Sequence, residues 1–455
     1  MLVKSISGIR GTIGGRVGEG LNPVDIVRFA AAYATQRRQA LPENRKLVVG
    51  RDARVSGAML DQLVTATLSG IGYHVVNIGL ATTPTTELAV IGEQAAGGII
   101  LTASHNPKQW NALKLLNERG EFLSDAEGKE VLAIAEREDY TFAEIDELGQ
   151  VEYKDYLPYH VQNVLDLKLV DKAAIEAADF TVVIDCVNSV GGLAIPAMLE
   201  ALGVKNIIRM NCTPDGHFPH NPEPIPQNLT DISEKMRTAK ADVGFVVDPD
   251  VDRLAIVCED GEMFGEEYTL VSVADYVLSH TPGNTVSNLS SSRALADVTK
   301  RHGGMYEASA VGEVNVTTLM RKNNAVIGGE GNGGVIYPAS HYGRDALVGV
   351  ALFLSSLAQK KMKVSELRKT FPNYCISKNR IDLTPDMNVD ELLERVQKLY
   401  ANERVTTIDG VKIDFADGWV HLRKSNTEPI IRIYSEADTM EHADALAQKV
   451  KEAIS

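Results

Sequence analysis

A serine and a histidine stand side by side after an apolar run, in the sequence TASHNP at 102–107. Residues 96–101 predict a short buried strand, and loops at the carboxyl ends of parallel α/β strands are where ligands collect. Ser104, displayed by such a surface-facing loop with His105 beside it and Lys114 ten residues on, is a candidate nucleophile or phosphate carrier. The alternative is a turn serine, because S-x-N-P is also ordinary turn chemistry.

Three carboxylates alternate along DPDVDR at 248–253. In an extended segment Asp248, Asp250 and Asp252 point to one side, where they repel each other unless they share a cation. An all-carboxylate donor set favours a hard ion such as Mg²⁺. A calcium EF-hand loop competes with this interpretation, but Arg253 replaces its required glycine and the flanking residues predict strands. A solvated acidic turn is the remaining alternative.

Three further segments carry groups suited to a phosphorylated sugar. Glycines flank Arg10, which predicts a tight turn that leaves the arginine free to enter a cleft. The glycine-rich residues 328–334 lack the Lys-Ser/Thr of a P-loop, and their acid, Glu330, suits sugar hydroxyls better than phosphate. The sequence RKSNTEPIIR at 423–432 offers two arginines, two hydroxyls and an amide to a phosphate dianion. A basic hairpin edge that opposes aggregation is the alternative for this last segment.

The elements that must position these groups alternate between strand and helix. Strands at 46–50 and 74–79 enclose a helix at 56–70, which predicts a parallel sheet with crossover helices. The acidic residues 125–148 are expected to form a helix that leads out of this first domain. Two more α/β units follow, and the last 85 or so residues predict an α+β module with a D-G hairpin turn. The predicted domains are 1–148, 149–256, 257–368 and 369–455.

Composition limits the classes of partner. The chain has 455 residues, of which 44% are hydrophobic and 24% charged, as in an ordinary globular protein. Its net charge of −15 argues against a nucleic acid or an anionic membrane as partner. Four cysteines without C-x-x-C spacing fit a reducing compartment. The first 15 residues contain no apolar h-region, and no run approaches 18 apolar residues. We therefore expect a cytoplasmic protein.

Taken together, the motifs resemble those of the α-D-phosphohexomutases. That family's signatures are T-[AG]-S-H-N-P followed by N-G/A-x-K, a [DS]-G-x-R-G element, the metal loop D-P-D-x-D-R and the phosphate loop R-x-S-N-T-E-P. Each has a counterpart here in the expected order. The family's sugar loop, typically G-E-x-S-G-H, is altered, since Asn332 stands for the serine and Gly334 for the histidine. The role of that histidine is thus vacant.

The resemblance implies a fold and a site. The fold would be three similar α/β domains with mixed sheets and a smaller C-terminal α+β domain, heart-shaped around a central cleft. Ser104 would be carried as a phosphoserine and would hold Mg²⁺ together with Asp248, Asp250 and Asp252. Arg10 would lie in the active site, Lys114 would be the general acid/base, and His105 would orient the phosphoserine or share that duty. The implied substrate-binding residues are Arg253, Glu330, Asn332, Arg423, Ser425, Asn426, Thr427 and Arg432.

The implied reaction is that of a phosphosugar mutase, an isomerase that moves a phosphoryl group between C6 and C1 of a hexose through a hexose 1,6-bisphosphate. Glucosamine phosphate is the expected substrate, and a phosphomannomutase/phosphoglucomutase is the alternative. An inactive sugar-phosphate-binding protein is a remote alternative, because a binder needs no phosphoryl carrier. A Mg²⁺-dependent phosphatase would need an aspartate nucleophile in another loop context. The expected assembly is a monomer or homodimer.

Overall fold

The computed structural model describes residues 1–5, 8–383, 387–424 and 430–454. It contains two compact units, each made of two stretches of the chain. The first unit is Met1–Thr269 with Asn332–Leu367, and the second is Leu270–Gly331 with Arg368–Ser455. The predicted domain boundaries after residues 148, 256 and 368 stay a prediction.

The first unit begins with a seven-stranded mixed sheet. Its strands, in spatial order, are β1 (Leu2–Ser5), β2 (Gly8–Thr12), β6 (Trp110–Leu116), β5 (Gly98–Leu101), β3 (Lys46–Arg51), β4 (His74–Leu80) and β7 (Val151–Tyr153). The strands β5, β3, β4 and β7 are parallel, whereas β6, β2 and β1 run antiparallel to their neighbours. The predicted turn around Arg10 is wrong, because residues 8–12 form β2 and pair with β6.

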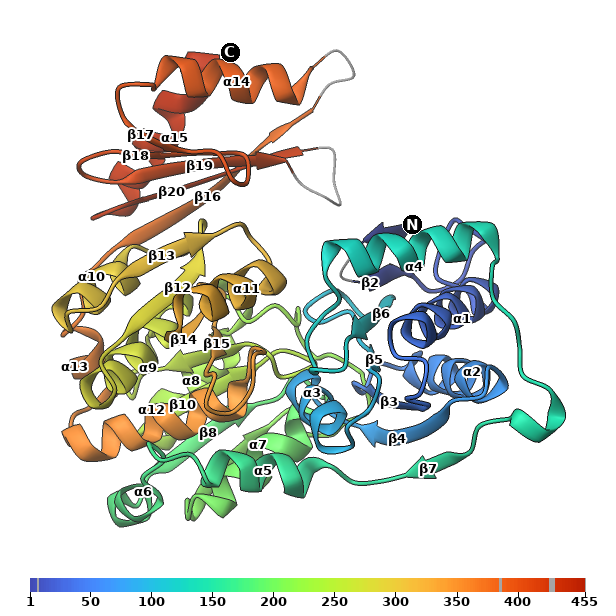
Figure 1. Cartoon of the computed structure of the whole chain (residues 1–455). Helices are drawn as coiled ribbons and strands as arrows, with labels where there is room; N and C mark the ends of the chain where they lie inside the picture. Colours follow the sequence, from blue (N-terminus) through green and yellow to red (C-terminus); the bar gives the residue numbers. More distant parts are fainter. Residues whose placement is uncertain (6–7, 384–386, 425–429, 455) are drawn as a thin grey trace. The chain divides into compact units, whose positions relative to one another are not determined.

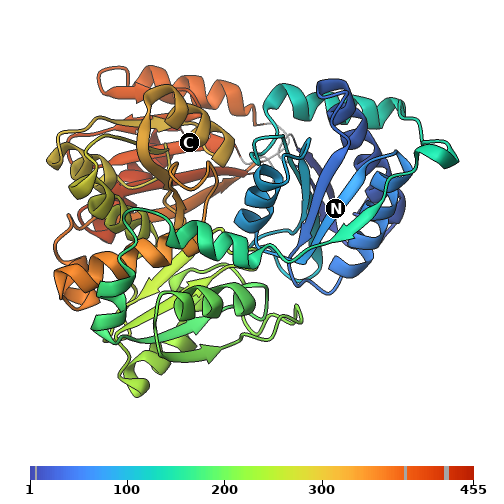
Figure 2. The same cartoon turned by 60° about the horizontal axis from the view of Figure 1, so that its bottom comes forward.

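Helices cover both faces of this sheet. The helices α1 (Pro23–Ala40), α2 (Gly57–Gly70) and α4 (Asp125–Arg137) pack together on one face, and α3 (Thr83–Gly92) contacts β3 and β5 on the other (Figures 1 and 2). The helix expected across 125–148 ends at Arg137, because Glu138 adopts a left-handed conformation with φ 53°. The short 3₁₀ helix η1 (Ile145–Glu147) follows.

A second sheet completes the first unit, with the strand order β11 (Leu254–Val257), β10 (Val243–Val247), β8 (Thr181–Asp185) and β9 (Asn206–Met210). Its helices are α5 (Leu157–Leu165), α6 (Lys172–Ala178), α7 (Gly191–Ala201) and α8 (Thr230–Ala239), and η2 (Pro226–Asn228) is a 3₁₀ turn. After the chain returns from the second unit, β15 (Gly334–Ile336) precedes α12 (Ala346–Lys360). Figure 2 shows α12 beside α5, α6 and α7, which it contacts.

The second unit holds a parallel sheet and an antiparallel one. The strands β13 (Tyr306–Ser309), β12 (Asn284–Asn288) and β14 (Ala325–Glu330) are parallel and pack with α10 (Ala294–Arg301) and α11 (Glu313–Asn323). The helices α9 (Glu266–His280) and α13 (Val364–Arg368) cross the limits between the units. The C-terminal sheet has the order β16 (Cys375–Asp382), β20 (Ile430–Ala437), β19 (Trp419–Lys424), β18 (Val411–Asp414) and β17 (Arg404–Thr406). Two helices, α14 (Val389–Leu399) and α15 (Met440–Ile454), pack with it.

This architecture confirms the expected fold class of successive α/β units followed by an α+β module. No helix in the described residues is long and apolar enough to cross a membrane.

Candidate active site

Ser104 lies in the turn after β5 and faces the metal loop. Its backbone is left-handed, with φ 49°, and its N–H donates to Thr102 Oγ1 at 2.9 Å. Its hydroxyl donates to Asp248 Oδ2 at 2.7 Å, while His105 Nδ1 lies 3.4 Å from the same Oγ. The expectation of a surface-facing serine is wrong, because only 4% of Ser104 is exposed. A left-handed non-glycine residue is uncommon and here aims the hydroxyl at a carboxylate.

Arg54, which the sequence analysis did not identify, holds the backbone of the serine loop through hydrogen bonds. Its buried guanidinium donates to the carbonyl oxygens of Ser104, Asn106, Pro107 and Trp110. Its Nε donates to Asp52 Oδ2 at 3.0 Å, and the same oxygen accepts the Thr102 hydroxyl at 2.7 Å. An arginine can satisfy several carbonyl groups at once because it has five fixed donors. The motif R-D-x-R at 51–54, directly after a strand, was the available signal.

The metal loop is a turn and not the extended segment that was expected. Val251 has φ 63°, which is unusual for a β-branched residue, and it is fully buried. Asp248 Oδ1 accepts the backbone N–H groups of Asp252 at 3.2 Å and Arg253 at 3.1 Å. The turn still brings the three carboxylates together, since one oxygen of each lies within 4.8 Å of the others.

The remaining carboxylate oxygens suit a hard cation. Asp250 Oδ2 accepts from Lys114 Nζ at 2.7 Å and from Thr83 Oγ1 at 2.6 Å, where Thr83 opens α3. In the described residues, Asp250 Oδ1 and Asp252 Oδ1 are buried without a hydrogen-bond partner, and Arg253 Nε is 3.9 Å from the latter. Burial and the two neighbouring aspartates raise the pKa of Asp248. Converging buried oxygens that lack a donor fit a divalent ion with oxygen ligands.

Three cationic or titratable side chains surround the serine. Burial acts to lower the pKa of Lys114, but Asp250 and Asp252 outweigh it and the pKa is raised. Burial, with Arg253 and Arg10 nearby, holds the pKa of His105 well below its usual value. Arg10, on β2, donates to Asn106 Oδ1 at 3.0 Å. The predicted group Arg10, Ser104, His105, Lys114 and the aspartates thus meets within the first unit.

The altered sugar loop is shorter than expected, because β14 extends to Glu330 and β15 starts at Gly334. The Glu330 carboxylate is buried, and its Oε1 accepts from Asn288 Nδ2 at 2.7 Å and from Gly312 N at 3.2 Å. Asn332 Oδ1 accepts from Gly334 N at 3.3 Å. Glu330 belongs to the second unit and Asn332 to the first, so each is described only with its own unit.

The basic segment lies in the second unit, on the C-terminal sheet. Arg423 and Arg432 are directly opposite each other on β19 and β20, and Arg380 on β16 is opposite Arg432. Opposed residues share a face, and like charges in that position are unfavourable unless an anion lies between them. Arg380 was not predicted, because nothing in the local sequence reveals its register. Ser425, Asn426 and Thr427 lie outside the described residues.

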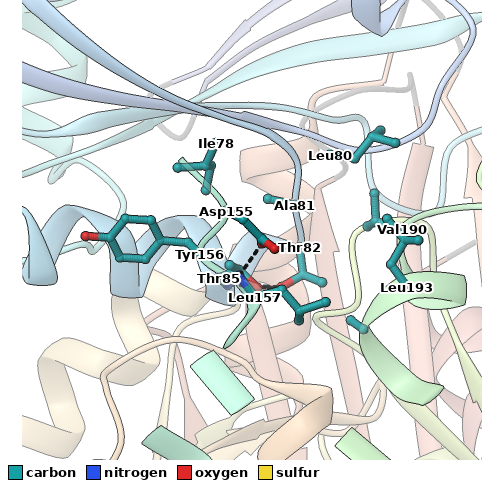
Figure 3. Close-up of a pocket in the computed structure, with 11 residues that line it drawn as sticks. Ile78, Leu80, Ala81, Thr82, Thr85, Asp155, Tyr156, Leu157, Val190 and Leu193 are labelled. Carbon is teal, nitrogen blue, oxygen red and sulfur yellow. Dashed lines mark hydrogen bonds between the residues drawn. The ribbon is translucent and has the colours of Figure 1, made fainter. Parts of the chain in front are cut away.

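A small pocket shown in Figure 3 lies behind the first turn of α3. Thr82 and Thr85 face it and bond to each other at 2.7 Å, whereas Thr83 between them bonds to Asp250. The pocket's other walls come from the end of β4 with Ala81, from residues 155–157 and from the start of α7, and Asp155 is its one charged lining residue among those described. The pocket therefore lacks the groups for phosphoryl chemistry, which sit at the metal loop.

A serine hydroxyl bonded to one of three clustered, buried carboxylates in an α/β fold is suited to metal-assisted phosphoryl transfer, and sequence comparisons identify the family. Four family models match it: phosphoglucomutase/phosphomannomutase α/β/α domains I, II and III at residues 3–142, 158–261 and 265–374, and the C-terminal domain at 385–453. The chain belongs to this family, the α-D-phosphohexomutases, and is a phosphohexomutase, an isomerase.

Its relatives carry more than one substrate name. A phosphoglucomutase/phosphomannomutase of Thermococcus kodakarensis is 36% identical over 443 residues, covering 95% of each chain. A probable phosphoglucosamine mutase of Methanopyrus kandleri is 33% identical, covering 97% of this chain and 95% of the relative. Among solved structures, a phosphoglucomutase/phosphomannomutase family protein of Burkholderia thailandensis superposes with a TM-score of 0.86 at 26% identity, covering 100% of this chain and 97% of that one.

Proposed function

We propose that this phosphohexomutase converts glucosamine 6-phosphate to glucosamine 1-phosphate, with phospho-Ser104 as the phosphoryl carrier. The observation that carries the proposal is the 2.7 Å bond between Ser104 Oγ and Asp248, within the group of three buried aspartates. By resemblance, Ser104 is the family's phosphoserine residue.

In the proposed reaction, the free hydroxyl of the bound hexose monophosphate attacks the phosphorus on Ser104. The bond from phosphorus to Oγ breaks as the new ester bond forms, and the hydroxyl proton passes to a nearby base. The product is a hexose 1,6-bisphosphate, and Ser104 Oγ leaves with a proton. The bisphosphate turns over, and Oγ loses that proton as it attacks the phosphorus of the other phosphate. The ester bond from this phosphorus to the sugar oxygen breaks, the sugar oxygen takes up a proton, and Ser104 regains a phosphoryl group. Such transfers depend mainly on positioning and on stabilisation of charge.

The chain's own residues divide this work. Asp248, Asp250 and Asp252 would hold Mg²⁺, which when bound neutralises charge on the migrating phosphoryl group. Arg10 and Arg253 add positive potential. Lys114 is the proposed general acid/base, and His105, whose Nδ1 lies 3.4 Å from Ser104 Oγ, orients the phosphoserine or shares that duty. Arg423 and Arg432 bind the phosphate that is not transferred. We add Arg380 to these two phosphate ligands, because it lies directly opposite Arg432 in the sheet. Ser425, Asn426 and Thr427 join them by resemblance.

Glu330 supports glucosamine phosphate as the substrate. Its buried carboxylate is held by Asn288 and Gly312, and a fixed acid favours a 2-ammonium group over a neutral hydroxyl. The opening S-G-I-R-G also resembles phosphoglucosamine mutases more than phosphomannomutase/phosphoglucomutases. One hydrogen bond to a charged partner is worth about 1.5–3 kcal/mol, or roughly ten- to a hundredfold in discrimination.

Glucose or mannose phosphate is the second candidate substrate, favoured by the printed name of the Thermococcus kodakarensis relative and by the altered sugar loop. The test is kcat/KM for glucosamine, glucose and mannose 6-phosphates side by side, each with its own 1,6-bisphosphate as primer. We expect glucosamine 6-phosphate to lead. An equal or higher value for glucose or mannose would reassign the substrate and leave the phosphoserine mechanism standing.

A further inference from the structure

Arg344 reaches the metal loop from the segment that follows the altered sugar loop. Its NH2 donates to Asp252 Oδ2 at 2.6 Å, with 10% of the arginine side chain exposed and none of the aspartate side chain. Sequence reasoning assigned Arg344 no role. It stands ten residues after Gly334, where the family pattern has a histidine.

Gly334 makes the room that Arg344 occupies. A Cβ atom at position 334 would lie 2.3 Å from Arg344 Cδ and 3.0 Å from its Cγ. Contacts that short do not occur, so any side chain at position 334 must displace the arginine stem. The position of Arg344 therefore requires glycine at 334, where the family pattern has a histidine.

Backbone bonds fix both ends of the segment that carries Arg344. Leu254 N donates to Gly333 O at 3.0 Å, and Ala346 N donates to Val251 O at 3.2 Å. Arg344 itself bridges to Ile336, and the N–H of Asp345 donates to Val335 O at 2.8 Å. These backbone bonds fix the segment beside the metal loop, so the Arg344 guanidinium starts from a rigid backbone position.

The ion pair between Arg344 and Asp252 has the same arrangement as the ion pair between Lys114 and Asp250. In each pair the cation binds Oδ2, with Lys114 Nζ also 3.5 Å from Asp252 Oδ2, and Oδ1 is left buried without a donor. Each of these aspartates therefore offers a single oxygen to a cation. Mg²⁺ demands near-ideal octahedral geometry and keeps several waters, so it takes few protein ligands, whereas Ca²⁺ takes six to eight oxygens and accepts both oxygens of one carboxylate.

We propose that Arg344 is a positioning residue that blocks one oxygen of Asp252 and so makes the site select Mg²⁺ over Ca²⁺. The inference rests on the proposed magnesium site. Removing the arginine's charge raises affinity for both divalent ions alike, because both carry the same charge. The ratio of the two dissociation constants therefore isolates the effect of the blocked oxygen.

The test is calorimetric titration of the dephosphorylated protein with MgCl₂ and with CaCl₂. Arg344→Met should shift the ratio of dissociation constants towards Ca²⁺ by roughly tenfold, the usual scale for residues that orient a ligand. Gly334→Ala, which keeps the arginine but pushes it away, should give a similar shift. The double variant should shift no further than Arg344→Met. Arg301→Met, which removes an arginine paired with Asp275 in the second unit, is the control and should leave the ratio unchanged.

Each other outcome overturns part of the inference. An unchanged ratio in both single variants rejects the role of Arg344 and leaves the proposed function standing. Additive shifts in the double variant reject the link between Gly334 and Arg344. A wild-type protein that binds neither ion rejects the proposed metal site and the inference with it. If Arg344→Met does not fold, as judged by circular dichroism, Gly334→Ala alone decides the matter.

Discussion

Two buried groups of carboxylates lie in the first unit, and Asp345 in the second group differs from the 248–252 aspartates in how completely its own two oxygens are bonded. In the aspartate group at 248–252, two oxygens have no donor among the described residues. In the second group Asp345 is fully engaged. Its Oδ1 accepts from the first turn of α12, and its Oδ2 lies 2.8 Å from His160 Nε2 and 3.2 Å from His341 Nε2. His341 Nδ1 is 3.2 Å from Glu87.

The difference separates a group built for a ligand from a group built for the fold. Asp345 already has its counter-charges in the protein, because Glu87 and Asp345 outweigh burial and raise the pKa of His341 to about 10. The 248–252 aspartates receive only part of theirs. We therefore expect substitutions to affect activity in the first group and stability in the second.

Ser104→Ala gives the largest expected effect. It tests the open group, meaning Asp248, Asp250 and Asp252, because Ser104 bonds to Asp248. Activity should fall by several orders of magnitude because no phosphoryl carrier remains, while the thermal midpoint stays close to wild type. Turnover is measured with saturating 1,6-bisphosphate, and intact mass should show one phosphate on the wild type and none on the variant. A variant that keeps a tenth of wild-type turnover would contradict the carrier role.

Asp345→Asn tests the closed group, meaning Asp345 with Glu87, His160 and His341. The variant leaves His341 and His160 with one buried partner fewer, and breaking a buried ion pair in this way costs about 3–5 kcal/mol. The matched variant Asp248→Asn should leave metal-free stability equal or higher, because it relieves repulsion among the three aspartates and its amide can still bond Ser104 and the backbone N–H groups of Asp252 and Arg253. The measurement is the free energy of unfolding of both variants and the wild type, from urea titrations in EDTA. Equal losses of free energy in the two variants would contradict the distinction between the groups.

The closed group should also give a pH dependence. The folded pKa of His341, about 10, lies above its ordinary 6.5, so its contribution is complete below 6.5 and is lost as the pH rises towards 10. One proton limits the slope to about 1.4 kcal/mol per pH unit. Unfolding free energies of wild type and His341→Gln should converge as the pH rises from 6.5 to 10. A constant gap would show that His341 does not carry a charge there.

Thr85→Val is expected to have the smallest effect. Thr85 Oγ1 lies 2.9 Å from His160 Nδ1, and a neutral hydrogen bond of this kind contributes about 1 kcal/mol. Stability should fall by about that amount with kcat/KM unchanged. A fall in activity without loss of stability would mean that the closed group takes part in the reaction.

The sequence predicted which residues lie together at the candidate site better than it predicted their backbone conformation. Ser104, Lys114 and the aspartates were identified because their types and order are distinctive, and periodicity located most of the strands that precede them. The turn at Val251 was missed, since a buried valine in a left-handed conformation contradicts local propensity. Arg54 and Arg344 were missed because their partners, Ser104 and Asp252, are distant in sequence. Such partners follow only from the tertiary fold.

The first unit is interrupted by the Leu270–Gly331 stretch, which belongs to the second unit. During synthesis the metal loop leaves the ribosome well before Arg344, Asp345 and α12, although all of them are needed to close the same unit. The nascent first unit must therefore wait, with α5, α6 and α7 lacking the helix that packs on them. Exposed apolar surface in that interval is a hazard that a chaperone could relieve, and a premature stop within 270–331 would yield a chain that never completes either unit.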